Sequence, residues 1–169
     1  KMLSEGAVKE INELTGKYAN KRSAVMPSLF VVQREYGYVT EEGMREVANI
    51  LGLKPVQIFE VATFYTMYNK KPVGKYHIQV CTNISCSLLG ADHIMDFLSH
   101  RLGVKVKETT PDKMFTLSAV ECLGSCGTAP MMQINDRYYE DLTKEKIEEV
   151  LKGLKYDGFV KSGVPIATK

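Results

Sequence analysis

The sequence has 169 residues, of which 44% are hydrophobic and 25% are charged, and its net charge is +2. Such a chain is long enough to bury a core without covalent cross-links, and its composition excludes a disordered or collagen-like protein. Lys and Arg alternate with Glu along the expected helices, so no nucleic-acid partner is expected. No apolar run approaches the roughly 18–20 residues that cross a bilayer, and the first residues lack a signal-peptide core. We therefore expect a soluble, cytoplasmic protein with no direct membrane insertion.

The first part of the chain, residues 1–72, predicts a helical domain, because apolar residues recur there at helical spacing. Helix-capping residues, proline and glycine set the expected bounds. The four expected helices run from Leu3 to Leu14 with Gly16 as the stop, from Ser23 as N-cap to Tyr36 with Pro27 in the first turn, from Thr40 to Gly52, and from Pro55 towards Tyr68.

The pattern changes at residues 70–74, where the sequence KKPVG indicates a domain boundary. Residues 73–155 predict an α/β domain, in which strands and helices alternate. The expected elements are a strand over Lys75–Val80 with Cys81 at or just past its end, a helix over Leu88–Leu102 with Leu89 and Ile94 in its apolar stripe, a strand over Phe115–Val120 with a weaker candidate at Val104–Lys107, a hairpin around Asn135–Asp136, and a last helix capped by Thr143.

Residues 156–169 lose periodicity and are expected to form a C-terminal tail. Phe159, Val160 and Ile166 make this segment more apolar than a free tail needs. Docking on a partner and a disordered end are equally consistent with it.

The four cysteines of the chain are gathered in two short segments. Cys81 and Cys86 are spaced C-x4-C, and Cys122 and Cys126 are spaced C-x3-C. Each pair follows a predicted strand, and segments at the carboxyl ends of strands in an α/β sheet converge at one edge. The pattern therefore predicts that the four thiols lie together. In a reducing compartment, clustered cysteines indicate metal ligands or redox groups rather than structural disulfides.

An iron–sulfur cluster suits this arrangement, because a [2Fe–2S] centre takes four thiolates, two for each iron. Small residues such as Gly124 and Gly127 allow backbone N–H groups to approach sulfur, and the helix expected after Cys86 would present its positive end. Neither cysteine segment contains Lys or Arg, and Glu121 adjoins Cys122. We therefore expect a low reduction potential.

Three other interpretations of the thiols remain. Structural zinc also takes four cysteines, but its usual spacing is C-x2-C or close to it. Two disulfides are geometrically allowed, yet the expected compartment disfavours them. A thiol oxidoreductase needs a pair such as C-x-x-C, which the sequence lacks. A zinc-stabilised interaction module with no redox role is therefore the alternative of a different class.

The cysteine spacing, with the strings ECLGSCGTAP, RSAVMPSLFVVQREYGYVT and VATFYTMY, resembles a known family. It is similar to the small two-iron, thioredoxin-like ferredoxin subunits of NADH:quinone oxidoreductase, respiratory complex I. The similarity extends from about Ile11 to Leu154. Relatives of these subunits also occur in NAD-linked hydrogenases and formate dehydrogenases, which are the alternative host complexes.

The resemblance implies an N-terminal helical domain followed by a thioredoxin-like domain with one [2Fe–2S] cluster on Cys81, Cys86, Cys122 and Cys126. It implies a flavoprotein partner that binds FMN and NADH, with which the cluster exchanges single electrons, in a complex peripheral to the inner membrane. It also suggests a cis peptide bond before Pro130. The chain lacks G-x-G-x-x-G and phosphate-loop motifs, so FMN and NADH are expected in the partner only and no catalytic residue is expected here.

The remaining polar and aromatic candidates have ordinary interpretations. The three histidines, His77, His93 and His100, are expected to be surface or supporting groups rather than ligands. Phe64, Tyr65 and Tyr68 are expected to lie partly in the core and partly on a surface that faces a partner. The helical glutamates are expected on solvated faces and not as paired acids: Glu41, Glu42, Glu145, Glu148 and Glu149.

Overall fold

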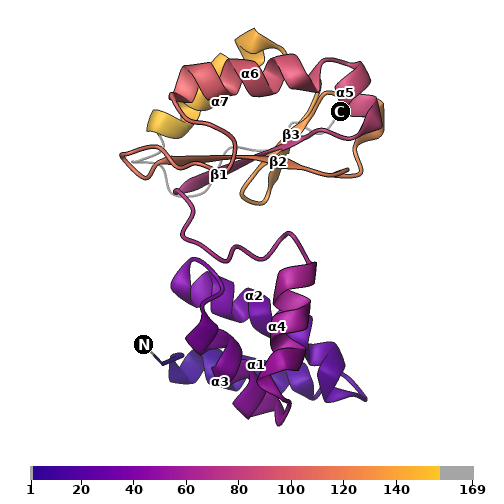
Figure 1. Ribbon diagram of the computed structural model, residues 1–169, viewed down its shortest axis with the longest axis vertical. Coiled ribbons are helices and arrows are strands. Elements are labelled where there is room, and N and C mark those ends of the chain that lie inside the picture. Colours follow the sequence, from indigo (N-terminus) through magenta and orange to yellow (C-terminus); the bar gives the residue numbers. More distant parts are fainter. Residues whose placement is uncertain (1, 157–169) are drawn as a thin grey trace. The chain divides into compact units, whose positions relative to one another are not determined.

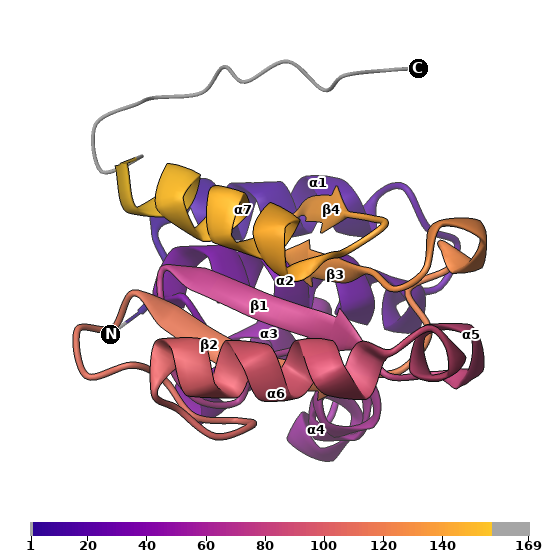
Figure 2. The same ribbon diagram turned by 90° about the horizontal axis from the view of Figure 1, so that it is seen from above.

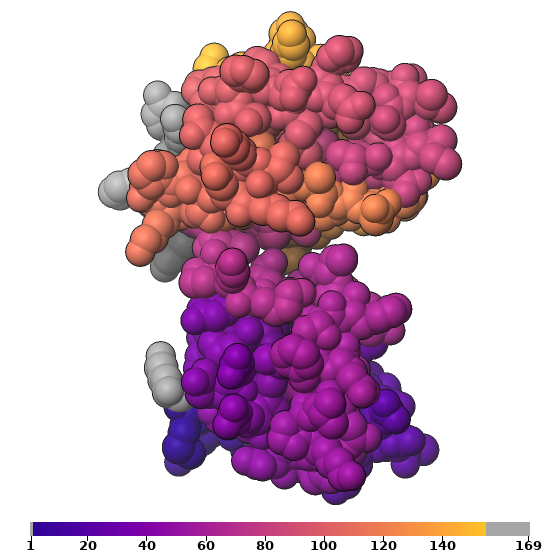
Figure 3. All heavy atoms as spheres, viewed as in Figure 1, coloured from indigo at the N-terminus to yellow at the C-terminus, as the bar shows by residue number. Residues whose placement is uncertain are grey.

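The computed structural model describes residues 2–156 (Figure 1). It divides into two compact units, with the boundary between Val73 and Gly74. Each unit can be followed by colour in the space-filling view (Figure 3). The tail expected at residues 156–169 lies, apart from its first residue, outside the described residues.

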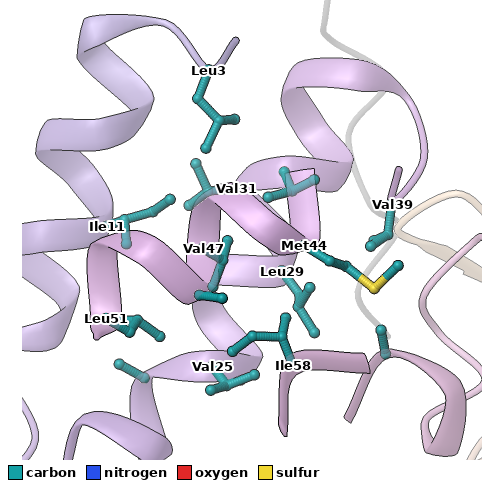
Figure 4. Packing of buried hydrophobic residues seen from close by; sticks show 14 of the residues in the cluster. Leu3, Ile11, Val25, Leu29, Val31, Val39, Met44, Val47, Leu51 and Ile58 are labelled. Atoms are coloured by element: carbon teal, nitrogen blue, oxygen red, sulfur yellow. The ribbon is translucent and has the colours of Figure 1, made fainter. Parts of the chain in front are cut away.

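The first unit is helical, as the sequence predicts. Its elements are α1 (Glu5–Thr15), the 3-10 turn η1 (Lys21–Ala24), α2 (Val25–Tyr36), α3 (Glu41–Leu51) and α4 (Pro55–Phe64). Each α-helix places apolar side chains in one common core, where Ile11, Leu29, Val47 and Ile58 are fully buried (Figure 4). The hydrophobic effect on these side chains is the main force that holds the unit together.

Two helix starts in this unit follow from their capping residues. The Ser4 hydroxyl accepts a bond of 3.2 Å from the Ala7 N–H, and the Thr40 hydroxyl accepts one of 2.9 Å from Gly43. Each cap satisfies an N–H that has no partner within the helix. Gly52 ends α3 with a φ of 66°, a backbone conformation that favours glycine.

Two helix ends in the first unit differ from the prediction. Ser23 is not an N-cap, because it lies inside η1, whose cap is Asn20; the Asn20 Oδ1 accepts a bond of 2.8 Å from the Arg22 N–H. Helix α4 ends at Phe64 and does not reach Tyr68, since the backbone is extended at Tyr65. Tyr68 instead turns inward, is 1% exposed, and donates its hydroxyl to the Met26 carbonyl at 3.0 Å.

The second unit is a four-stranded sheet with helices. Its elements are β1 (Tyr76–Cys81), α5 (Ile84–Leu88), α6 (Ala91–Leu102), β2 (Phe115–Val120), the 3-10 turn η2 (Cys126–Thr128), β3 (Met132–Ile134), β4 (Arg137–Tyr139) and α7 (Lys144–Tyr156). The strand order is β2-β1-β3-β4; β1 and β2 are parallel, and the other neighbours are antiparallel. Helices α6 and α7 cover the same face of the sheet (Figures 1 and 2).

The core of the second unit lies between these helices and the sheet. Ile78 and Val80, alternate residues of β1, are fully buried in this core. Leu98 of α6 and Ile147 of α7 belong to the same buried cluster. The period-two pattern that predicted β1 is therefore the pattern of burial. Strand β2, the hairpin and the Thr143 cap are also confirmed, since the Lys146 N–H donates to the Thr143 hydroxyl at 3.2 Å.

Two predictions in the second unit are wrong. The helix expected over Leu88–Leu102 is found as α6, but it begins only at Ala91, because Gly90 has a φ of 93°, which an α-helix does not allow. Leu89, expected in the buried stripe, is 58% exposed as a result. The segment Val104–Lys107 is not a strand, since it turns at Val106 and Lys107 has a φ of 72°. Among residues 2–156, no helix is long and apolar enough to cross a membrane.

Candidate metal centre

The parallel pairing of β1 and β2 brings both cysteine segments to one edge of the sheet. Cys81, the last residue of β1, lies opposite Val120, the last residue of β2, in the strand register. The chain then leaves both strands at the same end, and Cys122 follows two residues later. The convergence that the sequence predicted therefore follows from the strand register.

The first pair of thiols is buried. Cys81 and Cys86 are each 2% exposed, and they share a small apolar cluster with Ala91 and Met131. Cys86 lies within α5 rather than in a loop. The helix predicted after Cys86 as a source of positive dipole is correspondingly misplaced, because α5 begins before this residue and the next helix begins only at Ala91.

The second pair is exposed. Cys122 and Cys126 lie on an irregular segment and their sulfurs are 3.6 Å apart. The Gly124 N–H donates to the Cys122 sulfur at 3.4 Å, and Gly124 has a φ of 84°. This conformation favours glycine and turns the N–H towards the sulfur.

The environment of three of the thiols shifts their pKa values. Burial acts to raise the pKa of Cys81, but hydrogen bonds from the N–H groups of Asn83 and Leu123 and from the Cys86 thiol outweigh it, so this pKa is lowered. Burial and the contact with Cys81 raise the pKa of Cys86. The contact with Cys122 raises the pKa of Cys126. Leu123 belongs to the second segment, so its N–H joins that segment to the buried pair.

Polar side chains around the thiols connect the two segments and anchor the second. The Asn83 amide donates to the Glu121 carboxylate at 2.8 Å, which bridges the segments. The Tyr138 hydroxyl, at the hairpin, donates to the Leu123 carbonyl at 2.7 Å. The sequence analysis singled out neither Asn83 nor Tyr138, because each acts on a residue 15 or more positions away and no local pattern marks it.

The site fits a two-iron cluster on two observations. The sulfurs are grouped as a buried pair and an exposed pair, and a [2Fe–2S] centre needs two thiolates for each iron. Backbone N–H groups of Asn83, Leu123 and Gly124 are directed at sulfur, as an anionic cluster requires. Among residues 2–156, no group of three or more His, Cys, Asp and Glu side chains is arranged to hold a metal ion.

Two of the three histidines have hydrogen-bond partners of their own. The His77 Nε2 is 2.8 Å from the Ser118 hydroxyl on the sheet, and burial lowers its pKa. His93 and His100 lie on α6, where the His100 Nδ1 is 2.8 Å from the Asp96 carbonyl. These contacts give the histidines no assigned role as metal ligands.

The aromatic group divides as expected between core and surface. Phe64 is 78% exposed and Tyr65 37% exposed, whereas Tyr68 is buried. The peptide bond between Ala129 and Pro130 is cis, as the resemblance suggests.

Comparison with known proteins agrees with this chemistry. A sequence model of the family described as "Thioredoxin-like [2Fe-2S] ferredoxin" matches residues 11–155. The E subunit of the NADH-quinone oxidoreductase of Rickettsia conorii is 51% identical over 148 residues, which are 86% of this chain and 89% of that protein. The second E subunit of the NADH-quinone oxidoreductase of Rhizobium meliloti is 42% identical over 146 residues, 86% of this chain and 87% of that protein.

A solved structure shares the fold at low sequence identity. The air-oxidised NAD+-reducing [NiFe]-hydrogenase contains a chain with a TM-score of 0.64 and 18% identity. The match covers 81% of this chain but 23% of the hydrogenase chain. The likeness therefore concerns the architecture of the two units and not the activity of the whole hydrogenase.

Proposed function

Because the chain belongs to the thioredoxin-like [2Fe–2S] ferredoxin family, we propose that it is an electron-transfer subunit of an NADH:quinone oxidoreductase, corresponding to the E subunit of its relatives. The observation that carries this proposal is that the parallel strands β1 and β2 bring both cysteine segments to one edge of the sheet. The relatives at 42–51% identity, each named as a part of that complex, support the choice of host.

The four cysteines would hold the cluster in two pairs, Cys81 with Cys86 and Cys122 with Cys126. The buried pair would anchor it on the end of β1 and on α5, and the exposed pair would leave its other side near the surface. When bound, a [2Fe–2S] cluster supplies one-electron oxidation and reduction. The N–H groups directed at the sulfurs would stabilise its negative charge, while Glu121 beside Cys122 opposes further negative charge.

The partner in this proposal is a flavoprotein subunit that binds FMN and NADH, and the cluster exchanges single electrons with that FMN. The chain itself has no nucleotide-binding motif, so it would not act on NADH alone. The complex would be attached to the inner membrane through other subunits. The same carrier role in an NAD-linked hydrogenase is the alternative host, but its support is the shared fold at 18% identity.

The experiment is to express this chain with and without an FMN- and NADH-binding flavoprotein subunit of an NADH:quinone oxidoreductase from the same source, and to purify both samples anaerobically. We expect a stable heterodimer, in which a large excess of NADH over NAD+ elicits the EPR signal of a reduced [2Fe–2S] cluster. The chain alone should give this signal with a chemical reductant but not with NADH. Failure of the two chains to co-purify, or a cluster that NADH-reduced flavoprotein leaves oxidised, would contradict the proposal.

A further inference from the structure

A hydrogen-bonded group next to the exposed cysteines involves Glu140, which directly follows β4. One oxygen of its carboxylate, Oε1, accepts hydrogen bonds from the hydroxyls of Ser125 and Thr128, the latter at 2.7 Å. Ser125 immediately precedes Cys126, and Thr128 lies two residues after it. The Glu140 side chain thus binds the cysteine segment on both sides of Cys126.

The three side chains form a compact unit. The Ser125 and Thr128 hydroxyls are 2.8 Å apart, and all three residues are half-buried. Each hydroxyl has one proton to donate, and an ionised carboxylate only accepts, so Glu140 is able to receive both. Hydrogen bonds from the Ser125 hydroxyl, the larger cause, and from the Thr128 hydroxyl lower the pKa of Glu140, so its carboxylate is ionised at neutral pH.

Backbone contacts fix Glu140 itself. The N–H of the next residue, Asp141, donates to the Thr128 carbonyl at 2.8 Å, and the Lys146 ammonium of α7 donates to the Glu140 carbonyl at 2.6 Å. Hydrogen bonds thus hold the backbone on both sides of the Glu140 side chain, whereas the thiols of Cys122 and Cys126 are exposed.

We propose that Glu140 is a positioning residue that holds the Cys122–Cys126 segment in its ligating conformation and, through its charge, lowers the reduction potential of the cluster. This inference rests on the proposed function, since it assumes that these thiols hold a [2Fe–2S] cluster. Glu140 touches no thiol and acts through Ser125 and Thr128. Groups that orient metal ligands in this way typically change metal affinity about 10–100-fold when they are removed.

The two roles are separable by substitution. In Glu140→Gln the amide oxygen still accepts both hydroxyls, but the negative charge is lost. In Glu140→Ala both the acceptor and the charge are lost. Glu149, an exposed residue of α7 without contact to the cysteine segment, offers matched controls as Glu149→Gln and Glu149→Ala.

The first measurement is the redox titration of the full chain, followed by EPR. We expect Glu140→Gln to retain the iron and sulfide content of the wild type and to have a higher midpoint potential, while Glu149→Gln stays near the wild-type value. The charge role is overturned if Glu140→Gln shifts the potential no more than Glu149→Gln does.

The second measurement is the rate at which a chelator removes iron. We expect Glu140→Ala to lose iron about 10 times faster than the wild type and Glu140→Gln to stay close to it. Ser125→Ala should accelerate the loss too, and the double variant with Glu140→Ala should be less than additive, because both changes break one contact. Equal rates for Glu140→Ala and Glu149→Ala would overturn the positioning role.

A third measurement separates this proposal from the cluster assignment. In the metal-free chain, hydrogen exchange of residues 123–129 should be faster in Glu140→Ala than in Glu149→Ala, because the segment has lost its anchor. Unchanged exchange would overturn the positioning role in any case. The iron and sulfide content of the wild type, by contrast, tests the proposed function alone.

Discussion

The two segments that supply the thiols, residues 81–90 and residues 121–129, are built differently. The first continues a central strand into α5, and its two thiols are buried against Met131. The second has no regular element beyond a single 3-10 turn, its thiols are exposed, and polar contacts from the hairpin hold it. One thiol pair is therefore positioned by apolar burial and the other by hydrogen bonds, so the two should respond differently to substitution.

The largest effect on cluster binding is expected from Cys86→Ser and Cys122→Ser, and the two variants should differ in stability. Both remove a thiolate, so both should weaken or abolish cluster binding, measured as iron and sulfide content. In the metal-free chain, however, Cys86→Ser places a hydroxyl in a buried apolar site and should cost about 1–3 kcal/mol of unfolding free energy. Cys122→Ser should cost almost nothing, because its side chain is exposed.

Urea unfolding of the two metal-free variants measures this difference. Equal midpoints for Cys86→Ser and Cys122→Ser would contradict the contrast between a buried and an exposed pair. Wild-type iron content in either variant would contradict its role as a ligand.

Truncation of the apolar side chains behind each segment should show a difference of the same sign in unfolding free energy. Met131 is fully buried beside Cys81 and Cys86, and Met131→Ala should cost about 2–5 kcal/mol of unfolding free energy. Leu123, the half-buried apolar residue of the second segment, is the matched position. Calorimetric or urea unfolding in which Leu123→Ala costs as much as Met131→Ala would show that burial holds both segments.

The parts that the sequence could predict are those with a local signal. Alternation of apolar and polar residues over Lys75–Val80 predicted the first strand, a second strand was predicted at Phe115–Val120, and the spacing of the cysteines indicated a shared site. Parallel pairing then followed from the usual arrangement of such strands, and the register in fact places Cys81 opposite Val120. Even so, the spacing alone left zinc open as an alternative.

The parts that it could not predict depend on tertiary contacts or on backbone conformation. The leucines around Gly90 continue a helical stripe, yet the positive φ at Gly90 breaks it and leaves Leu89 exposed. Tyr68 fits the end of α4 by pattern, but burial and its bond to Met26 draw it out of the helix. Glu140 follows a short strand like many surface glutamates, and only the folded hairpin brings it to Ser125.

A single hydrogen bond from the hairpin should have a modest effect on the second segment. Tyr138→Phe removes the donor to the Leu123 carbonyl, and since Tyr138 is 50% exposed we expect a loss of about 0.5 kcal/mol. This corresponds to about a twofold faster loss of iron to a chelator. Tyr18→Phe, in the first unit, is the control. Equal rates of iron loss for Tyr138→Phe and Tyr18→Phe would show that the Tyr138 hydroxyl does not stabilise the second segment.

The smallest effect is expected at the bridge between the segments. Glu121→Ala removes the acceptor of the Asn83 amide, but both side chains are solvent-accessible, so the unfolding free energy of the metal-free chain should change by less than about 0.5 kcal/mol. Urea unfolding tests this value. A loss comparable with that of Met131→Ala would mean that the bridge, rather than the separate supports of each segment, organises the site.

The most direct test of the whole account is the metal and sulfide content of the anaerobically purified chain. Two thiol pairs at one sheet edge predict about two irons and two acid-labile sulfides per chain, with an EPR signal that appears only after one-electron reduction. One zinc per chain, with no sulfide and no such signal, would contradict it.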